Sequence, residues 1–253
     1  MTRRDHGPKD GRSYGGLSKE QRVAQRQTRL IDAALELFGT QGYAATSIER
    51  LCALANVSTR SFYEDMGSRE ALLIALGNRI TSRALECARA ALAATENEPL
   101  PVRIVASFRA YLGVTCADAR RARVCYVEVV GVSAVVEEWR RQQRRLLSAL
   151  LISEAERAVG RGETGPRRFD LFALAVIGAV TSLAQELVQS TAPDAAVGLD
   201  EICAEIAYFV HSGLSCPRVD PATGDPAGYL PGTPVLRESH AVEAEVSRAG
   251  PAR

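Results

Sequence analysis

The sequence predicts an all-α protein with an N-terminal three-helix domain, a C-terminal helical domain and disordered tails. Apolar residues recur at the spacing of amphipathic helices through most of residues 19–212. Capping boxes, in which Ser or Thr is followed three residues later by Gln or Glu, begin two of these segments at Ser18 and Thr46. Residues 124–130 are rich in β-forming residues, but we expect a helix there because no other segment could pair with it as a strand.

Three helices are expected in the N-terminal part. Residues 19–39 carry one apolar stripe, and Gly39 and Gly42 close this helix. A short helix follows at 46–55, then a tight turn and a second short helix at 58–66. The stripe of the first helix consists of Leu30, Ile31, Ala34, Leu35 and Phe38.

Longer helices are expected in the rest of the chain. Ser68 caps a helix at 68–93, and the two prolines of residues 98–101 interrupt the pattern. Further helices are expected at 102–115, 118–131, 133–158, 167–190 and 199–212. The helix at 167–190 is apolar almost all round, and such a helix must be buried on every side.

The composition changes at both ends of the chain. Six of the 11 prolines lie between Pro217 and Pro251 among glycines, so this stretch cannot bury enough apolar surface to fold. Residues 3–29 carry eight Lys and Arg against three Asp and Glu, in a chain of net charge +1, which suggests a polyanion partner. We therefore expect a flexible basic arm at 1–17, a helix-turn-helix domain at 18–67, a second helical domain at 68–213 and a Pro/Gly-rich tail at 214–253.

The composition argues against export, membrane insertion and catalysis. The N-terminus lacks the apolar stretch of a signal peptide, and the longest apolar run, Leu171–Val180, is far shorter than the roughly 20 residues of a spanning helix. The six cysteines lack metal-binding spacing and indicate free thiols in a reducing cytoplasm. With three histidines and no nucleophile or phosphate-loop motif, we expect no catalytic residue, no metal, no cofactor and no enzymatic activity.

Residues 46–66, TSIERLCALANVSTRSFYEDM, have the proportions of a helix-turn-helix. Asn56 stands where the turn needs a positive φ, which Asn tolerates better than most residues. With apolar residues such as Ile48 and Phe62 packed inward, the residues left facing outward are Ser58, Thr59, Arg60, Ser61 and Tyr63. Arginine can bond guanine in the major groove and hydroxyls can reach bases or phosphates, so this face predicts binding to double-stranded DNA. Arg22 and Arg26 of the preceding helix are further candidates for DNA contact.

Short motifs between residues 24 and 84 follow one another as Thr28–Ala34, Leu37–Phe38, Gly42–Tyr43, Thr46–Ile48, Val57–Ser58, Phe62–Tyr63 and Ser68–Leu72. In order and spacing they resemble the DNA-binding domain of the TetR family of transcriptional regulators. The resemblance implies a bacterial, cytoplasmic regulator that binds double-stranded DNA as a homodimer. It also gives residues 68–213 the size of the family's effector-binding and dimerisation domain.

The resemblance assigns roles to single residues. Thr46 matches a hydroxyl that touches phosphate, residues 58–61 match the recognition helix, and Tyr63 matches its phosphate-binding tyrosine. Arg69 matches a lysine that meets phosphate at the start of the fourth helix. The expected DNA-binding residues are therefore Arg26, Thr46, Ser47, Ser58, Thr59, Arg60, Ser61, Tyr63 and Arg69.

Three positions depart from the family pattern. Asn56 replaces the usual Gly, Asp65 stands where the family has His or Tyr, and Met66 stands where it has Phe. Glu64 and Asp65 would place two carboxylates near the DNA phosphates, which would weaken binding unless the basic arm offsets them.

A set of aromatic and polar residues in the helices of 100–190 could line an effector cavity or belong to the core. They are Phe108, Tyr111, Tyr126, Glu128, Trp139, Phe172 and Gln185. Glu128 and Gln185 need a partner in their apolar helices, which an effector, a neighbouring side chain or a second subunit could supply. The arginines of 120–123 and 140–145 either face solvent or pair with Glu137 and Glu138, with an anionic effector as the alternative.

Together these features predict a repressor that a small, largely apolar effector releases from a palindromic operator. Helices 167–190 and 199–212 would form the homodimer interface, and two recognition helices would enter major grooves about 34–36 Å apart. The effector would act by moving the long helix 68–93. One rival is a helical ligand-binding or scaffold protein whose degenerate helix-turn-helix does not bind DNA. The other is an α-helical enzyme, which the scarcity of histidine disfavours.

Overall fold

The computed structural model describes residues 18–189 and 198–215, and the regular elements within these ranges are all helical. The all-α prediction is therefore confirmed for the part of the chain that is described. The expected basic arm at 1–17 lies outside the described residues, as does the tail from residue 216 onward. In chain order the elements are α1 Lys19–Gln41, α2 Ile48–Ala55, α3 Thr59–Met66, α4 Arg69–Ala94, α5 Leu100–Thr115, α6 Ala119–Arg123, the π-helical turn η1 Val124–Glu128, α7 Ala134–Gly160, α8 Asp170–Gln189 and α9 Leu199–Ser215.

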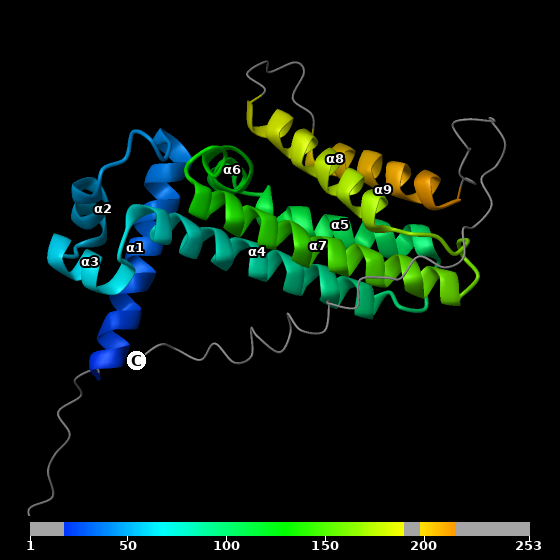
Figure 1. Cartoon of the computed structure of the whole chain (residues 1–253), viewed down its shortest axis with the longest axis horizontal. Coiled ribbons are helices and arrows are strands. Elements are labelled where there is room, and N and C mark those ends of the chain that lie inside the picture. The colour runs from blue at the N-terminus through cyan, green and yellow to red at the C-terminus, as the bar shows by residue number, and fades with distance from the viewer. Residues whose placement is uncertain (1–17, 190–197, 216–253) are drawn as a thin grey trace, which may run out of the picture.

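The helices form a small head and a longer body (Figure 1). Helices α1, α2 and α3 gather at one end, and α4 leads from them along the body beside α5 and α7. Helices α8 and α9 lie side by side across the body from α4, with α9 against α5 and α8 against α7. The head is thus joined to the body through α4, and α6 and η1 also pack against the end of α1.

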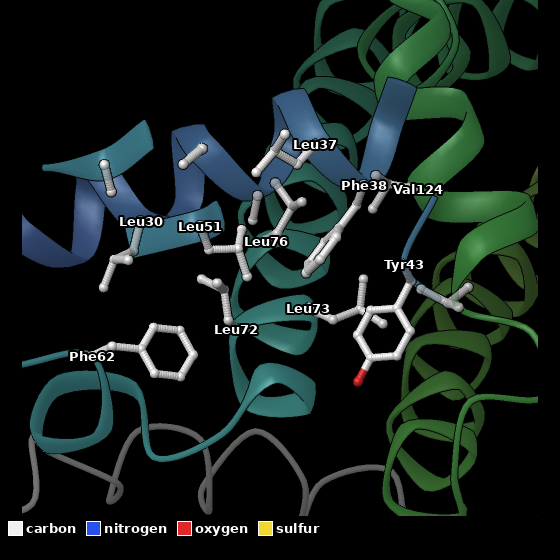
Figure 2. Close-up of a cluster of buried hydrophobic side chains, with 14 of the residues drawn as sticks. Leu30, Leu37, Phe38, Tyr43, Leu51, Phe62, Leu72, Leu73, Leu76 and Val124 are labelled. Atoms are coloured by element: carbon white, nitrogen blue, oxygen red, sulfur yellow. The ribbon is translucent and has the colours of Figure 1, made fainter. Parts of the chain in front are cut away.

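One apolar cluster holds the head together and continues into the body. Figure 2 shows Leu30 and Phe38 of α1 and Phe62 of α3 pointing toward Leu72 and Leu76 of α4. All five side chains are fully buried. Val124, Val129, Val136 and Trp139 belong to the same cluster. Because a close-packed core transmits displacement, movement of the body can reach the head through these contacts.

A second cluster fills the body between α5, α8 and α9. Leu112, Val176, Ile202 and Ile206 are among its most deeply buried members. A fully buried arginine, Arg103 of α5, lies at the far end of this body and pairs with Glu154 and Glu163. The body therefore combines an apolar core with one buried ionic network.

Several helix boundaries differ from the sequence prediction for local reasons. Helix α2 begins at Ile48 because Ser47, not Thr46, is its N-cap. Helix α5 begins at Leu100 because Pro101 lies in the first turn, where no backbone N–H is needed. The segment expected as one helix at 118–131 is divided into α6 and the π-helical turn η1. Helix α9 continues to Ser215, past its expected end.

Helix α8 is less buried than its sequence suggested. Leu171 remains 66% exposed and Leu174 is also exposed, as are Tyr208 and Phe209 of α9. The expectation that α8 is buried on every side is thus wrong for the single chain, because its outer face has no covering element among the described residues. By length and composition α8 could also cross a membrane, but a core helix of a soluble protein passes the same test, and 28% of the relevant window is already buried.

Candidate nucleic-acid interface and ligand cavity

Helices α2 and α3 form a helix-turn-helix whose ends are fixed by local hydrogen bonds. The Ser47 hydroxyl accepts from the Arg50 amide (3.3 Å), and Ser58 accepts from the Ser61 amide (3.1 Å). Asn56 between the helices has a φ of 51°, as the sequence predicted for the turn. Such capping removes unsatisfied backbone donors and sets where each helix begins. The residues of the turn and the caps therefore determine how α3 is oriented relative to α2.

Helix α3 presents a polar face to solvent. The Arg60 side chain is 88% exposed, and Tyr63 remains 53% exposed although it follows the buried Phe62. Ser58 and Thr59 are also exposed, and Ser61 is half-buried beside the Ser58 hydroxyl. The outward face expected from the sequence is thus present in the fold. Its contact with DNA remains a prediction.

Thr46 does not fit its expected role as a phosphate contact. Its side chain is fully buried and its hydroxyl donates to the Gly42 carbonyl (2.8 Å). The expectation was wrong because Thr46 closes the loop before α2, while Ser47 takes the capping position. Ser47 is half-buried and stays the candidate at this helix start.

Arg69 lies between the start of α4 and the loop before α2. Its guanidinium donates to the Thr46 carbonyl (2.5 Å) and stacks 4.3 Å from the centroid of the Tyr43 ring. These contacts hold a half-buried cation beside the N-terminus of α2. The position is compatible with the phosphate contact expected for Arg69, and that contact remains a prediction.

Asp65 is turned inward and neutralised by Arg26. The guanidinium donates from Nε to Oδ2 (2.6 Å) and from Nη2 to Oδ1 (3.0 Å), and the Asp65 side chain is only 5% exposed. This bond raises the pKa of Arg26. The expected repulsion of phosphates by Asp65 is therefore wrong, because the carboxylate is paired. Arg26 in turn connects α1 to α3. Because its Nε and Nη2 bond Asp65, fewer of its N–H groups are left for a contact with DNA.

Glu64 is exposed and pairs with Arg60 on the same helix face. The Arg60 Nε donates to Glu64 Oε1 (2.8 Å), one helical turn away. Both groups face solvent, so this pair is easily exchanged for another partner. The bond uses only Nε of Arg60, so a DNA phosphate or base can bond the terminal nitrogens while the Glu64 carboxylate stays nearby.

The body contains an open cavity of about 410 Å³ between α4, α5, η1, α7 and α8. Three residues expected to line an effector site do so, namely Tyr111, Tyr126 and Trp139. Phe108 and Phe172 instead line a smaller neighbouring cavity of about 40 Å³, which Tyr111 also borders. The larger space lies within the range typical of ligand pockets. Some of the residues named from the sequence thus line this cavity, and ligand binding there remains a prediction.

Glu128 and Gln185, both expected near the effector, line neither cavity. The Glu128 carboxylate accepts from the Tyr43 amide (2.6 Å) and from Arg123 Nε (2.7 Å), so it bridges η1 to the end of α1. The Gln185 amide donates to the Tyr126 carbonyl (2.8 Å) and ties α8 to η1. Each polar group has found a neighbouring chain segment as its partner, which is the structural alternative that the sequence left open.

The polar part of the larger cavity was only partly expected from the sequence, which left an anionic effector as the alternative role for the arginines of 140–145 and did not point to Thr81 or Gln143. Thr81, Arg140, Gln143 and Arg144 line it. Arg140 pairs with Glu137 (2.7 Å), and Arg141 pairs with Glu138 (2.6 Å), as the sequence allowed. The spacing of residues 140, 143, 144 and 147 on one face of α7 was the available signal.

The chain carries an exposed helix-turn-helix at the end of a helical body, which is the architecture of a helix-turn-helix protein. Residues 30–76 match the family model described as "Bacterial regulatory proteins, tetR family". This N-terminal segment is therefore similar to the tetR family of bacterial regulatory proteins.

One curated relative shares sequence similarity with this chain, and two solved structures share its fold. HTH-type transcriptional regulator BetI of Rhizobium meliloti is 37% identical over 87 residues, a segment that spans 34% of this chain and 43% of BetI. The transcriptional regulator FadR of Bacillus subtilis, solved with stearoyl-CoA, has a TM-score of 0.62 at 16% identity, covering 74% of this chain and 98% of FadR. AibR, solved with isovaleryl coenzyme A and operator DNA, has a TM-score of 0.54 at 19% identity, covering 73% of this chain and 97% of AibR. At these identities the structures establish the fold that the chain shares with them.

Proposed function

We propose that this chain is a DNA-binding transcriptional regulator that inserts α3 into the major groove of double-stranded DNA. The observation that carries the proposal is the exposed polar face of α3, with Arg60 and Tyr63 outward and Phe62 buried beneath them. Similarity to BetI over 87 residues and the fold shared with the DNA-bound AibR support it. Such a protein would act in the bacterial cytoplasm by binding and not by catalysis.

A homodimer through α8 and α9 is part of the proposal. Tyr208 is 69% exposed, and with Leu171, Leu174 and Phe209 it leaves an apolar face on this helix pair. A second copy related by a two-fold axis would cover both faces at once and form a four-helix interface. The two α3 helices would then read the two halves of a palindromic operator.

The proposed regulator is a repressor that a small molecule releases from its operator. The cavity lies between α4, which leads into the head, and η1, which contacts the end of α1. A ligand there would bias the positions of both elements, and coupling of about 1–3 kcal/mol between two sites is typical. The acyl-CoA complexes of FadR and AibR support a small-molecule effector for this fold.

The structure removes part of the evidence for the alternative hypothesis, in which a degenerate helix-turn-helix does not bind DNA. It rested on Glu64, Asp65 and Met66, yet Asp65 is paired with Arg26 and Met66 packs against the core of the head. No observation on the described residues favours this rival over the DNA-binding proposal.

Binding to random and selected duplexes across a salt series tests the proposed function. We expect log affinity to fall linearly with log salt, by about 0.9 for each phosphate contacted, and two chains to bind each selected duplex. Fluorescence anisotropy gives the affinity and analytical ultracentrifugation gives the stoichiometry. Absence of binding at low salt would favour the non-DNA-binding rival.

A further inference from the structure

The charged side chains that line the larger cavity are positive. Its charged lining residues are two arginines, Arg140 and Arg144, and no Asp or Glu belongs to the lining described. Much of the remaining lining is aromatic or aliphatic, including Tyr111, Trp139 and Ile177. The cavity therefore combines an apolar interior with positive charge on α7.

The two arginines differ in how they are compensated. Arg140 bonds both oxygens of Glu137, at 2.7 and 2.9 Å. The lowered pKa of Glu137 is caused mainly by the Gly131 amide and by Arg140, while Arg144 adds only a longer-range electrostatic effect. Arg144 is half-buried and makes no hydrogen bond or ion pair within the described part of the chain. The three side chains together carry one uncompensated positive charge, which belongs to Arg144.

Several other polar groups of the cavity are already bonded within the protein. The Trp139 indole donates to Asn78 Oδ1 (2.6 Å), and the Gln143 amide accepts from Thr81 (2.9 Å) and donates to Asn78 (3.2 Å). The Tyr126 hydroxyl bonds the Thr115 hydroxyl (3.0 Å), and burial raises its pKa, so this phenol stays neutral. A ligand therefore meets a mostly apolar interior, and Arg144 is the cation of the lining that has no hydrogen bond or ion pair within the described residues.

We propose that this cavity binds a carboxylic acid with an apolar body, whose carboxylate pairs with Arg144. A guanidinium matches the two oxygens of a carboxylate and forms charge-assisted hydrogen bonds with them. The apolar body lies against Tyr111, Trp139 and Ile177. The inference rests on the proposed function in that it names the class of effector, but the binding itself can be measured without DNA.

The single tryptophan of the chain, Trp139, lines the cavity and reports binding by its fluorescence. The probes are decanoate and 2-naphthoate, each below the concentration at which it self-associates. Their controls are the matched alcohols, a decylammonium cation and decanoyl-CoA. We expect each acid to bind about tenfold or more tightly than its alcohol, because only the acid forms charge-assisted bonds.

Substitutions on α7 locate the charge that is responsible. Arg144→Gln is expected to reduce the ratio of acid to alcohol affinity to about one, and Arg144→Lys to retain part of it. Arg145→Gln is the matched control, because Arg145 is the next residue and its side chain is 73% exposed. This control should leave the ratio unchanged, and thermal unfolding checks that each variant is folded.

Several results would overturn the inference. They are equal binding of acid and alcohol, an unchanged preference in Arg144→Gln, preference for the cation, binding of decanoyl-CoA alone, and no binding of any acid at millimolar concentration. DNA binding is measured on the same preparations. Intact DNA binding without acid binding would contradict this inference alone, whereas acid binding at Arg144 without DNA binding would contradict the proposed function alone.

Discussion

Replacing Arg60 and Tyr63 together by alanine is expected to weaken binding to a duplex selected by the natural sequence by roughly 30-fold or more. Both side chains point away from the core, while Phe62 between them is fully buried and anchors α3. The double substitution removes the guanidinium and the phenol without opening a cavity. Anisotropy titration at fixed salt measures the change.

Matched variants separate the loss of contact from an effect on folding. Arg141→Ala on α7 also removes an exposed arginine paired with a glutamate, and it should leave DNA affinity unchanged. Glu64→Gln should act in the opposite direction and strengthen binding, because it frees Arg60 and removes a carboxylate from the same face. Full affinity in the double variant, with an unchanged unfolding temperature, would show that α3 does not bind DNA.

Replacing Arg103 by methionine is expected to lower the free energy of unfolding by about 3–5 kcal/mol. The buried guanidinium bonds Glu154 (2.7 Å), both oxygens of Glu163 (3.0 and 2.7 Å) and the Glu98 carbonyl (2.7 Å). Methionine fills similar space but leaves the carboxylates without their cation. Denaturant unfolding of the natural chain and the variant measures the loss.

The pKa of Glu163 provides a second test of this network, through the pH dependence of stability. Arg103 lowers the pKa of Glu163 below its ordinary value of 4.5, so the pair stabilises the fold at neutral pH and the contribution is lost as the pH falls through that lowered pKa. Without Arg103 this loss on acidification should disappear. Arg109→Met is the control on the same helix, because Arg109 pairs with Asp200 in solvent and should change stability by less than about 1 kcal/mol. Equal effects of the two substitutions would contradict the role given to Arg103.

Features set by neighbouring residues were predictable from the sequence. The turn at Asn56 and the caps at Ser18 and Ser68 depend on interactions within a few residues, and all three are found in the fold. The apolar stripe of α1 depends on helical period alone, and Leu30, Ala34 and Phe38 are buried as expected. The resemblance of residues 24–84 to the tetR family is confirmed by the family-model match over residues 30–76.

Features set by distant residues were not predictable. Asp65 meets Arg26 across 39 positions, and Glu128 meets the Tyr43 amide across 85, so no local pattern shows either contact. The choice between Thr46 and Ser47 as the cap depends on a loop that buries Thr46. The polar side of the cavity depends on how α7 is rotated against α4 and α8, which its mixed sequence does not specify.

A photocrosslinking amino acid at Thr59 tests the central claim most directly. Thr59 is exposed at the start of α3, so its replacement should not disturb the core. We predict crosslinks to bases in the major groove of each half of a selected palindromic duplex, and none from the same group at position 145 on α7. Crosslinks from position 145 but not from position 59, under conditions in which the duplex is bound, would contradict the account.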